Sequence, residues 1–357
     1  MNNFFNQLLT RISIKEKTLF AKRLSFLIRA GVPIAQSLMI LRSQTKSGAR
    51  LRVMDQVLKD VNNGHYLSAS LAKFQHNFDP LAINLIRVGE ESGTLDENLN
   101  YLAEEMKKKQ ELRRKVLGAM VYPIFIILAT LGISGLLTIY IFPKILPIFA
   151  SLDVNLPITT RALIWTSDFL KNYGLYLALG LAGLIILNLF LVRTSNNFRL
   201  VAHKIVLKIP LIGSISKNYH LANICRTLGI LIKSDIRIIR AFTITSETIT
   251  NLVYKRELET ISKKLVRGDK IALNMSQRAH LFPSMLTNLV EIGEATGKLD
   301  ETFVYLSEMY EAEVDELTKN LSTILEPALM VFMGIVVGFI AVSIITPIYE
   351  ITRNLTP

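Results

Sequence analysis

The sequence is poor in the residues that build most catalytic and metal centres. It has one cysteine, Cys225, in 357 residues, which excludes an intramolecular disulfide and a thiolate metal site. Its five histidines are scattered without the spacing of a metal site, at positions 65, 76, 203, 220 and 280. It has no Gly-x-Ser-x-Gly nucleophile turn. We therefore expect a protein that is not an enzyme and that uses no cofactor, metal ion or catalytic residue.

Charged residues are missing from three long stretches, at 116–143, 172–192 and 327–349. Half of the chain is hydrophobic and its mean hydropathy is +0.36. Because roughly 20 apolar helical residues cross a bilayer, the sequence predicts transmembrane helices at 116–143, 172–192 and 321–349. The N-terminal residues lack the apolar core of a signal peptide, so we expect the internal spans to direct insertion.

The distribution of lysine and arginine predicts the orientation of these spans. Residues 1–115 contain 19 and residues 193–320 contain 18, whereas residues 144–171 contain three. Because basic segments stay in the cytoplasm, we expect two cytoplasmic domains, at 1–115 and 193–320. The loop at 144–171 and the tail at 350–357 are expected outside. Acidic residues interleave with the basic ones, so the net charge of +12 does not predict direct nucleic-acid binding.

One motif occurs twice in the chain. The stretch Val88–Glu97 reads VGEESGTLDE and returns 204 residues later as IGEATGKLDE. The offset holds without a gap over about a hundred residues, so that Phe78 corresponds to Phe282 and Pro123 to Pro327. A fixed internal period indicates a duplicated structural unit. The second span returns the chain to the cytoplasm, so both copies run from a bundle into a span.

Apolar residues in each copy recur at three- and four-residue spacing, which predicts helices. Turn residues divide the first copy into six helices, the first at 14–29, and no stretch alternates with the period of a strand. The predicted fold is all-α: a polytopic membrane protein with two homologous six-helix cytoplasmic bundles. The sixth helix is expected to continue into the first span and to bend at Pro123. Asp235 replaces Gly31 in the second copy, where we expect the turn to be rebuilt.

The duplicated motif supplies candidate site residues. A phosphate-loop interpretation of Gly293–Lys298 is disfavoured because its spacer is one residue short and Leu299 stands at the magnesium-binding position. The acidic side chains either bind a divalent cation or cap and solvate the next helix, and the lack of calcium-loop spacing favours capping. These candidates are Gly89, Glu90, Gly93, Leu95, Asp96, Gly293, Glu294, Gly297, Leu299 and Asp300.

A second set of candidates lies where each copy enters the membrane. Intramembrane acids often mark ion paths, but a carboxylate at the entrance, such as Glu326, can reach water or cap a helix start. We favour the structural role. The candidates of this junction are Lys115, Tyr122, Pro123, Pro143, Glu326 and Pro327. Further, the basic segment 107–109 corresponds to the acidic segment 311–313, so we expect separate docking surfaces, which can include contact between the two bundles themselves.

The duplicated Gly-Glu-x-x-Gly-x-Leu-Asp unit resembles that of the inner-membrane platform proteins of type II secretion systems and type IV pili, the general secretion pathway F family. The junction Lys115–Pro123, the stretch Ile141–Pro143 and the pair Leu156-Pro157 are also similar to that family's signature. The resemblance extends from about Leu19 to Tyr349. It is weaker at the second junction, where Asn320 and Glu326 replace the signature types.

The resemblance implies a multi-pass protein of the bacterial inner membrane that forms a homo-oligomer, with its outer segments in the periplasm. It implies a scaffold that recruits a hexameric assembly ATPase, pilin-like subunits and other inner-membrane assembly proteins. A membrane transporter or channel subunit is the alternative function. Secretion, pilus assembly and DNA uptake all stay open, as do the oligomeric state, the bundle that contacts the ATPase, and divalent-cation binding at the turns.

Overall fold

The structure, a computed structural model, describes residues 12–45, 48–75, 77–150 and 157–355. Every regular element within these residues is a helix, so the predicted all-α class is confirmed. The chain divides into two compact units. The first unit combines the residues up to Lys115 with His203–Glu316, and the second combines Val116–Ala202 with the residues from Leu317 onward.

The first repeat forms a bundle of six helices in the described residues, as the turn residues predict. Ser13 begins the first of them with a capping box that it shares with Glu16. Asp79 caps the fifth helix through the backbone N–H of Ala82, and Pro80 occupies its first turn. The helices are α2 (Ile14–Arg29), α3 (Ile34–Ser43), α4 (Gly48–Asn62), α5 (Leu67–Ala72), α6 (Pro80–Ser92) and α7 (Leu95–Ala119).

The second repeat reproduces this bundle, and most helix bounds follow the 204-residue offset. Leu24 and its counterpart Leu228 are both fully buried, as are Phe78 and Phe282 at 4% and 0% exposure. The duplication therefore preserves the core as well as the turns. The helices are α12 (Ile212–Lys233), α13 (Ile238–Thr248), α14 (Leu252–Leu265), α15 (Ile271–Ser276), α16 (Ser284–Thr296) and α17 (Leu299–Leu355).

The turn at Asp235 keeps the geometry of its counterpart, so the expectation that it is rebuilt is wrong. Gly31 has φ +81° and Asp235 has φ +59°, both in the left-handed region. The N–H of Ile236 donates to the carbonyl of Leu231, just as Val32 donates to Leu27. The short polar side chain of aspartate tolerates this region better than most residues do, although at a cost that glycine does not have.

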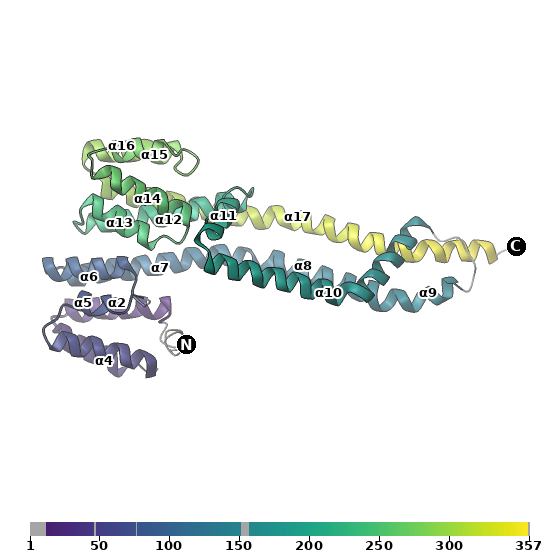
Figure 1. Ribbon diagram of the computed structural model, residues 1–357, viewed down its shortest axis with the longest axis horizontal. Coiled ribbons are helices and arrows are strands. Elements are labelled where there is room, and N and C mark those ends of the chain that lie inside the picture. The colour runs from purple at the N-terminus through teal and green to yellow at the C-terminus, as the bar shows by residue number, and fades with distance from the viewer. Residues whose placement is uncertain (1–11, 46–47, 76, 151–156, 356–357) are drawn as a thin grey trace. The chain divides into compact units, whose positions relative to one another are not determined.

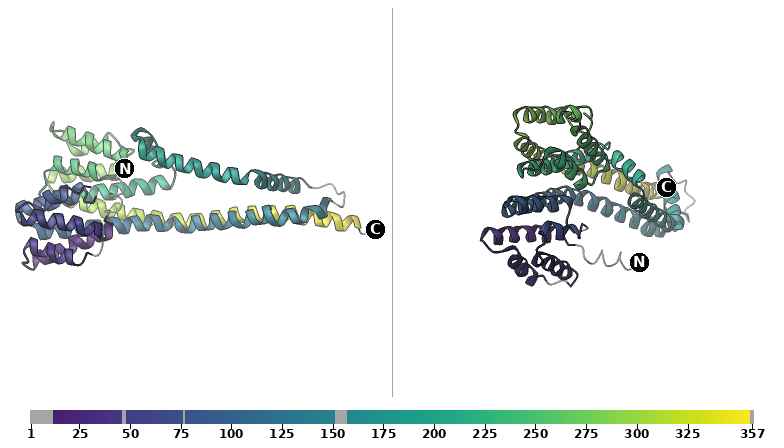
Figure 2. Two further views of the ribbon diagram at one scale, coloured as in Figure 1. Left: turned by 60° about the horizontal axis from the view of Figure 1, so that its bottom comes forward. Right: turned by 60° about the vertical axis from the view of Figure 1, so that its left-hand side comes forward.

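The two bundles pack against each other within the first unit. Helix α6 of the first repeat contacts α13 of the second. In Figure 1 the two bundles lie one above the other, with α6 and α7 facing α12 and α13, and the right-hand view of Figure 2 shows the same layering. The contact therefore joins different faces of two homologous bundles.

The second unit contains the apolar helices. Three segments are long and apolar enough to cross a membrane, at Leu95–Ile145, Ile158–Val192 and Leu299–Pro347. The segment 144–171, expected as a loop, is helical at both ends. Its first residues belong to the helix that ends at Ala150. Its last residues belong to the helix that begins after Pro157, which no breaker interrupts. Residues 151–156 lie outside the described part. The helices are α8 (Val121–Leu136), the π-helix η1 (Leu137–Ile141), α9 (Phe142–Ala150), α10 (Ile158–Thr194) and α11 (Asn196–Val206), which crosses the unit boundary.

The helix is interrupted at Met120, three residues before Pro123, rather than at the proline itself. A proline removes the hydrogen bond to the carbonyl four residues earlier and crowds that carbonyl. The interruption between α7 and α8 therefore falls in the turn that precedes Pro123. In the second repeat, Pro327 lies inside α17, which continues through it.

Hydroxyl groups join the helices of the second unit. Thr160 Oγ1 donates to the carbonyl of Ser343 at 2.8 Å, and Ser167 Oγ donates to the carbonyl of Thr138 at 2.7 Å. Thr138 lies in η1, where the wider turn disturbs the regular carbonyl pairing. Phe142, Leu163 and Ile340 form a small buried cluster in this unit. Such interhelical hydrogen bonds are typical of helices packed in lipid, where side-chain hydroxyls have few other partners.

Candidate functional site

The motif glycines serve two different backbone requirements. Gly93 and Gly297 end α6 and α16 in the left-handed region, with φ +76° and +74°. Gly89 and Gly293 lie where the following helix approaches closely. A Cβ at Gly89 would lie 2.7 Å from the Cα of Leu95, and one at Gly293 would lie within 3.0 Å of the Thr302 side chain. Both glycine pairs thus make the tight helix–turn–helix possible.

The motif glutamates cap the short helices α5 and α15. Glu90 accepts hydrogen bonds from the backbone N–H groups of Leu67 and Ser68, the latter at 2.9 Å. Glu294 accepts the equivalent bonds from Ile271 at 2.9 Å and Ala272 at 3.3 Å. A carboxylate that satisfies two free N–H groups at a helix start is stabilised by the helix dipole. The sequence predicted capping by this cluster, but of the helix that follows rather than the one 23 residues earlier.

The remaining motif residues fix the start of α7 and α17. Leu95 and Leu299 are buried, at 5% and 6% exposure. Asp96 pairs with Arg29 at 3.1 Å, and its carbonyl accepts a hydrogen bond from Ser25. Asp300 lies in the first turn of α17, as Asp96 does in α7. Among the described residues, no group of three acidic, histidine or cysteine side chains could hold a metal ion.

The junction candidates do not form one cluster. Lys115 Nζ pairs with Asp315 at 2.6 Å in the first unit, whereas Tyr122 and Pro123 lie in α8 and Pro143 in α9. Glu326 is exposed and Pro327 follows it within α17. The helix runs through both positions, so Glu326 does not cap a helix start. Access to water is the part of its expected structural role that stays a prediction.

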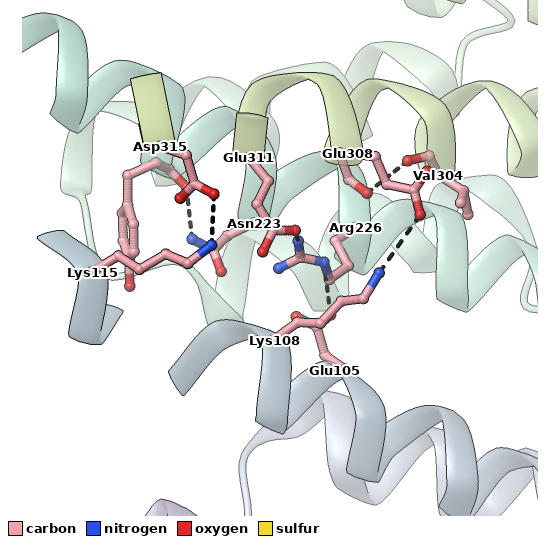
Figure 3. A network of polar contacts seen from close by, with 11 residues as sticks. Glu105, Lys108, Lys115, Asn223, Arg226, Val304, Glu308, Glu311 and Asp315 are labelled. Atoms are coloured by element: carbon pink, nitrogen blue, oxygen red, sulfur yellow. Dashed lines mark hydrogen bonds and ion pairs between the residues drawn. The ribbon is translucent and has the colours of Figure 1, made fainter. Parts of the chain in front are cut away.

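The contact between the repeats centres on a buried arginine that the sequence did not single out. Arg226 of α12 lies between two carboxylates from different repeats (Figure 3). It pairs with Glu311 of α17 and lies 3.7 Å from Glu105 of α7. The side chains of Arg226 and Glu105 are 4% and 1% exposed. Neither oxygen of Glu105 has a hydrogen-bond partner among the described residues, and burial raises the pKa of this carboxyl. Arg226 opposes this rise most strongly, with smaller contributions from Lys109 and Lys108.

More exposed pairs surround this cluster. Lys108 lies 3.6 Å from Glu308, and Lys115 pairs with Asp315 (Figure 3). Exposed ion pairs of this kind contribute little stability, typically about 0–1 kcal/mol, but they select the register of the contact. The basic segment of the first repeat therefore faces acidic residues of the second. The structure therefore has the contact between the bundles that the charge pattern allowed for, and docking of separate partners stays a prediction.

Asp60 and His220 are among the titratable groups outside the apolar segments whose pKa values are shifted. Hydrogen bonds from Lys73 and Ser70 lower the pKa of Asp60 to about 2 and tie α4 to α5. Burial lowers the pKa of His220 to about 4, so this imidazole is neutral at physiological pH. His220 packs 5.5 Å from the ring of Tyr254 in the core of the second repeat. Both groups support the helix packing and neither lies in an open cleft.

The repeat structure agrees with what a comparison with protein families finds. A family model described as "Type II secretion system (T2SS), protein F" matches residues 20–143 and again residues 224–347. The two matched ranges are offset by the same 204 residues as the motif and together cover more than half of the chain.

Curated relatives match over nearly the whole chain. A type IV pilus assembly protein PilC from Thermus thermophilus is 33% identical over 343 residues, which is 96% of this chain and 84% of the relative. PilC of Pseudomonas aeruginosa is 30% identical, over 93% of this chain and 89% of its own. A type II secretion system protein F from Aeromonas hydrophila is 30% identical, over 96% and 87%. The chain therefore belongs to the type II secretion system protein F family, the multi-pass inner-membrane platform proteins of secretion and pilus machines.

Proposed function

We propose that the chain is a non-enzymatic platform that couples a cytoplasmic assembly ATPase to the extraction and polymerisation of pilin-like subunits. The observation that carries this proposal is the composition of α17. One helix contains an acidic bundle segment, residues 299–316, and an apolar segment of membrane-spanning length. A chain built this way can hold partners on both kinds of surface, in water and in lipid.

The proposed topology follows from the lysine and arginine distribution. Residues 1–115 and 193–320 lie in the cytoplasm, the spans are 116–143, 172–192 and 321–349, and the segments 144–171 and 350–357 lie in the periplasm. In this arrangement the paired bundles are accessible to an ATPase, and the apolar helices are accessible to the membrane segments of pilin-like subunits. The motif residues shape the bundle turns rather than bind a ligand.

Thiol labelling tests this topology. In a Cys225→Ser background, Ile158→Cys places a thiol at a side chain that is 85% exposed. An impermeant maleimide should label it in cells whose outer membrane is permeabilised. Lys59→Cys, exposed on α4, should react only after lysis. Labelling in the reverse pattern would refute the orientation.

Binding to the ATPase is tested with the full chain in lipid nanodiscs. The duplication offers matched variants: Arg52→Glu with Lys59→Glu on α4, and Arg256→Glu with Lys263→Glu at the corresponding exposed positions of α14. We expect the hexameric ATPase to co-purify with the wild-type chain and one of the two double variants to lose it. Pilin-like subunits should co-purify with both variants, because α4 and α14 lie outside the apolar helices.

A transporter is the competing function, and a flux assay separates the two. Vesicles that contain the chain alone should show no more ion or solute flux than empty vesicles. Selective flux, together with no binding of the ATPase by any form of the chain, would overturn the platform proposal.

A further inference from the structure

The contact between the repeats uses a different face of each bundle. The first repeat contributes α6 and α7, and the second contributes α12, α13 and α17. Arg240 of α13 donates to Asn84 of α6 at 3.2 Å, and Lys233 of α12 lies over the ring of Tyr101 of α7 at 5.1 Å. A contact between unlike faces leaves one face of each partner unused. In the first repeat the uncovered face is formed by α2 and α3. In the second repeat it is formed by α16 and by the side of α17 that points away from the first repeat.

Exposure identifies the unused α16–α17 face of the second repeat. Asn84 is 8% exposed, whereas its counterpart Asn288 is exposed. Leu81 is 2% exposed, and its counterpart Met285 is 52% exposed. Because the two bundles share a fold, such differences mark the surface that only the first repeat buries. Ile292 and Tyr305 extend this face, at 58% and 57% exposure.

The α2–α3 face of the first repeat is its complement and is also uncovered. Lys22, Arg29 and Gln36, the counterparts of Arg226, Lys233 and Arg240, are all exposed. Apolar side chains lie among them along the same two helices: Leu19 at 43%, Phe26 at 71% and Met39 at 55% exposure. Apolar residues gathered on a polar-rimmed face typically mark a protein contact.

We propose that a second copy of this chain covers these faces. The α16–α17 face of one copy docks on the α2–α3 face of the next, in the way that the two repeats dock within one chain. The interface inside the chain is thus continued between chains. This inference stands apart from the coupling to an ATPase, because it concerns only copies of this chain.

The side chains at the corresponding positions fit this continuation. Gln36 can donate to Asn288 as Arg240 donates to Asn84, and Arg29 can lie over Tyr305 as Lys233 lies over Tyr101. Lys319 and Glu111 correspond to the pair Lys115 and Asp315 and keep the same signs. At the position of the buried Glu105, the second repeat has Met309, so the contact between chains needs no buried carboxylate there.

The charges of the two faces are complementary. Helix α2 has five basic residues and one acidic residue. Helices α16 and α17 have no basic residue up to position 316. Glu308, Glu311 and Asp315 of α17 face the first repeat of the same chain, whereas Glu291 of α16 and Glu316 of α17 are exposed. Opposite potentials of this kind speed the encounter of two surfaces and discourage contact between like faces. Two α2–α3 faces would repel each other, so the contact joins unlike faces.

Cross-linking between tagged copies tests the proposal in membranes that contain the full chain. In a Cys225→Ser background, one copy has Gln36→Cys and a differently tagged copy has Asn288→Cys. We expect a short bismaleimide to join the two tags when both variants are present, and neither variant to dimerise alone. Arg240→Cys with Asn84→Cys in one chain is the positive control. The two positions are in contact within the chain, so the product should be a cross-linked monomer and not a dimer. Lys59→Cys replaces Gln36→Cys as the exposed negative control.

A charge variant completes the test. Adding Phe26→Glu, at an α2 position that is 71% exposed, to the Gln36→Cys copy should reduce the cross-linked product about tenfold, as expected for losing one apolar interface contact. The intrachain cross-link between positions 84 and 240 should stay unchanged and report a folded bundle. Three results would each overturn the proposal: dimers of Asn288→Cys alone, equal products with Lys59→Cys, or no product between the two tags.

Discussion

Replacing Arg226 by methionine should open the contact between the two repeats. The substitution keeps an apolar stem of similar length and removes the cation that acts most strongly on Glu105. Breaking a buried ion pair on one side costs about 3–5 kcal/mol, because the other charge stays buried without a partner. Glu311 is 18% exposed and can turn toward water, so the cost falls mainly on Glu105, which is 1% exposed. We therefore expect a value near the lower limit, about 3 kcal/mol.

The assay is the labelling rate of a thiol placed inside the contact. Asn84→Cys, in a Cys225→Ser background, puts that thiol at a position that is 8% exposed and lies against α13. When labelling requires the repeats to separate, its rate scales with the population of the open form. A loss of about 3 kcal/mol corresponds to a labelling rate roughly 100-fold faster. The full chain in detergent or nanodiscs is suitable, since no unfolding transition is needed.

Two control variants make the result specific. Adding Glu105→Gln to Arg226→Met removes the stranded charge and should restore most of the slow labelling. Lys108→Met removes an exposed pair with Glu308, for which about 0–1 kcal/mol and at most a fivefold change are expected. If Arg226→Met labels no faster than Lys108→Met, or if Glu105→Gln restores nothing, burial of the pair does not hold the repeats together.

Three further perturbations test individual positions. His220 resists protonation in the folded core, so stability falls as pH drops through the unfolded pKa of 6.5 toward about 4. Relative to His220→Gln, the wild type should lose about 2 kcal/mol between pH 7 and pH 5, measured as faster labelling of Cys225 after correction for thiol reactivity. Asp235→Gly should stabilise the second repeat by about 0.5–1 kcal/mol in hydrogen exchange, because φ there is +59°. Gly93→Val should destabilise the first repeat by about 1–3 kcal/mol in the same experiment, and unchanged exchange would contradict a left-handed requirement.

The helices could be predicted from the sequence because their ends have local causes. Gly93, Gly297 and Asp79 act on their own turns, so the bounds of the first repeat follow from the breakers, and the duplication transfers them to the second. The same local reasoning failed at Glu326, because Pro327 was interpreted as a helix start. In a long apolar helix the loss of one hydrogen bond does not end the helix.

The cluster at Arg226 could not be predicted in the same way. Its partner Glu311 is 85 residues away in the chain, and Glu105 belongs to the other repeat. The counterpart of Arg226 is Lys22, an exposed residue, so comparing the two copies gives no sign of a buried charge. Only the packing of α7 against α12 and α17 brings the three side chains together. The opposite charges of segments 107–109 and 311–313 were the one signal that pointed to this surface.

The duplication also decides what binding stoichiometry can reveal. Each chain holds two bundles with one backbone design and different surface charges, so an assembly of any size contains the two kinds of bundle in equal numbers. A partner that recognises the basic α2 surface finds one site per chain, whereas a partner that recognises a feature common to both bundles finds two. Counting bound partners per chain therefore distinguishes recognition of a bundle's surface from recognition of its fold.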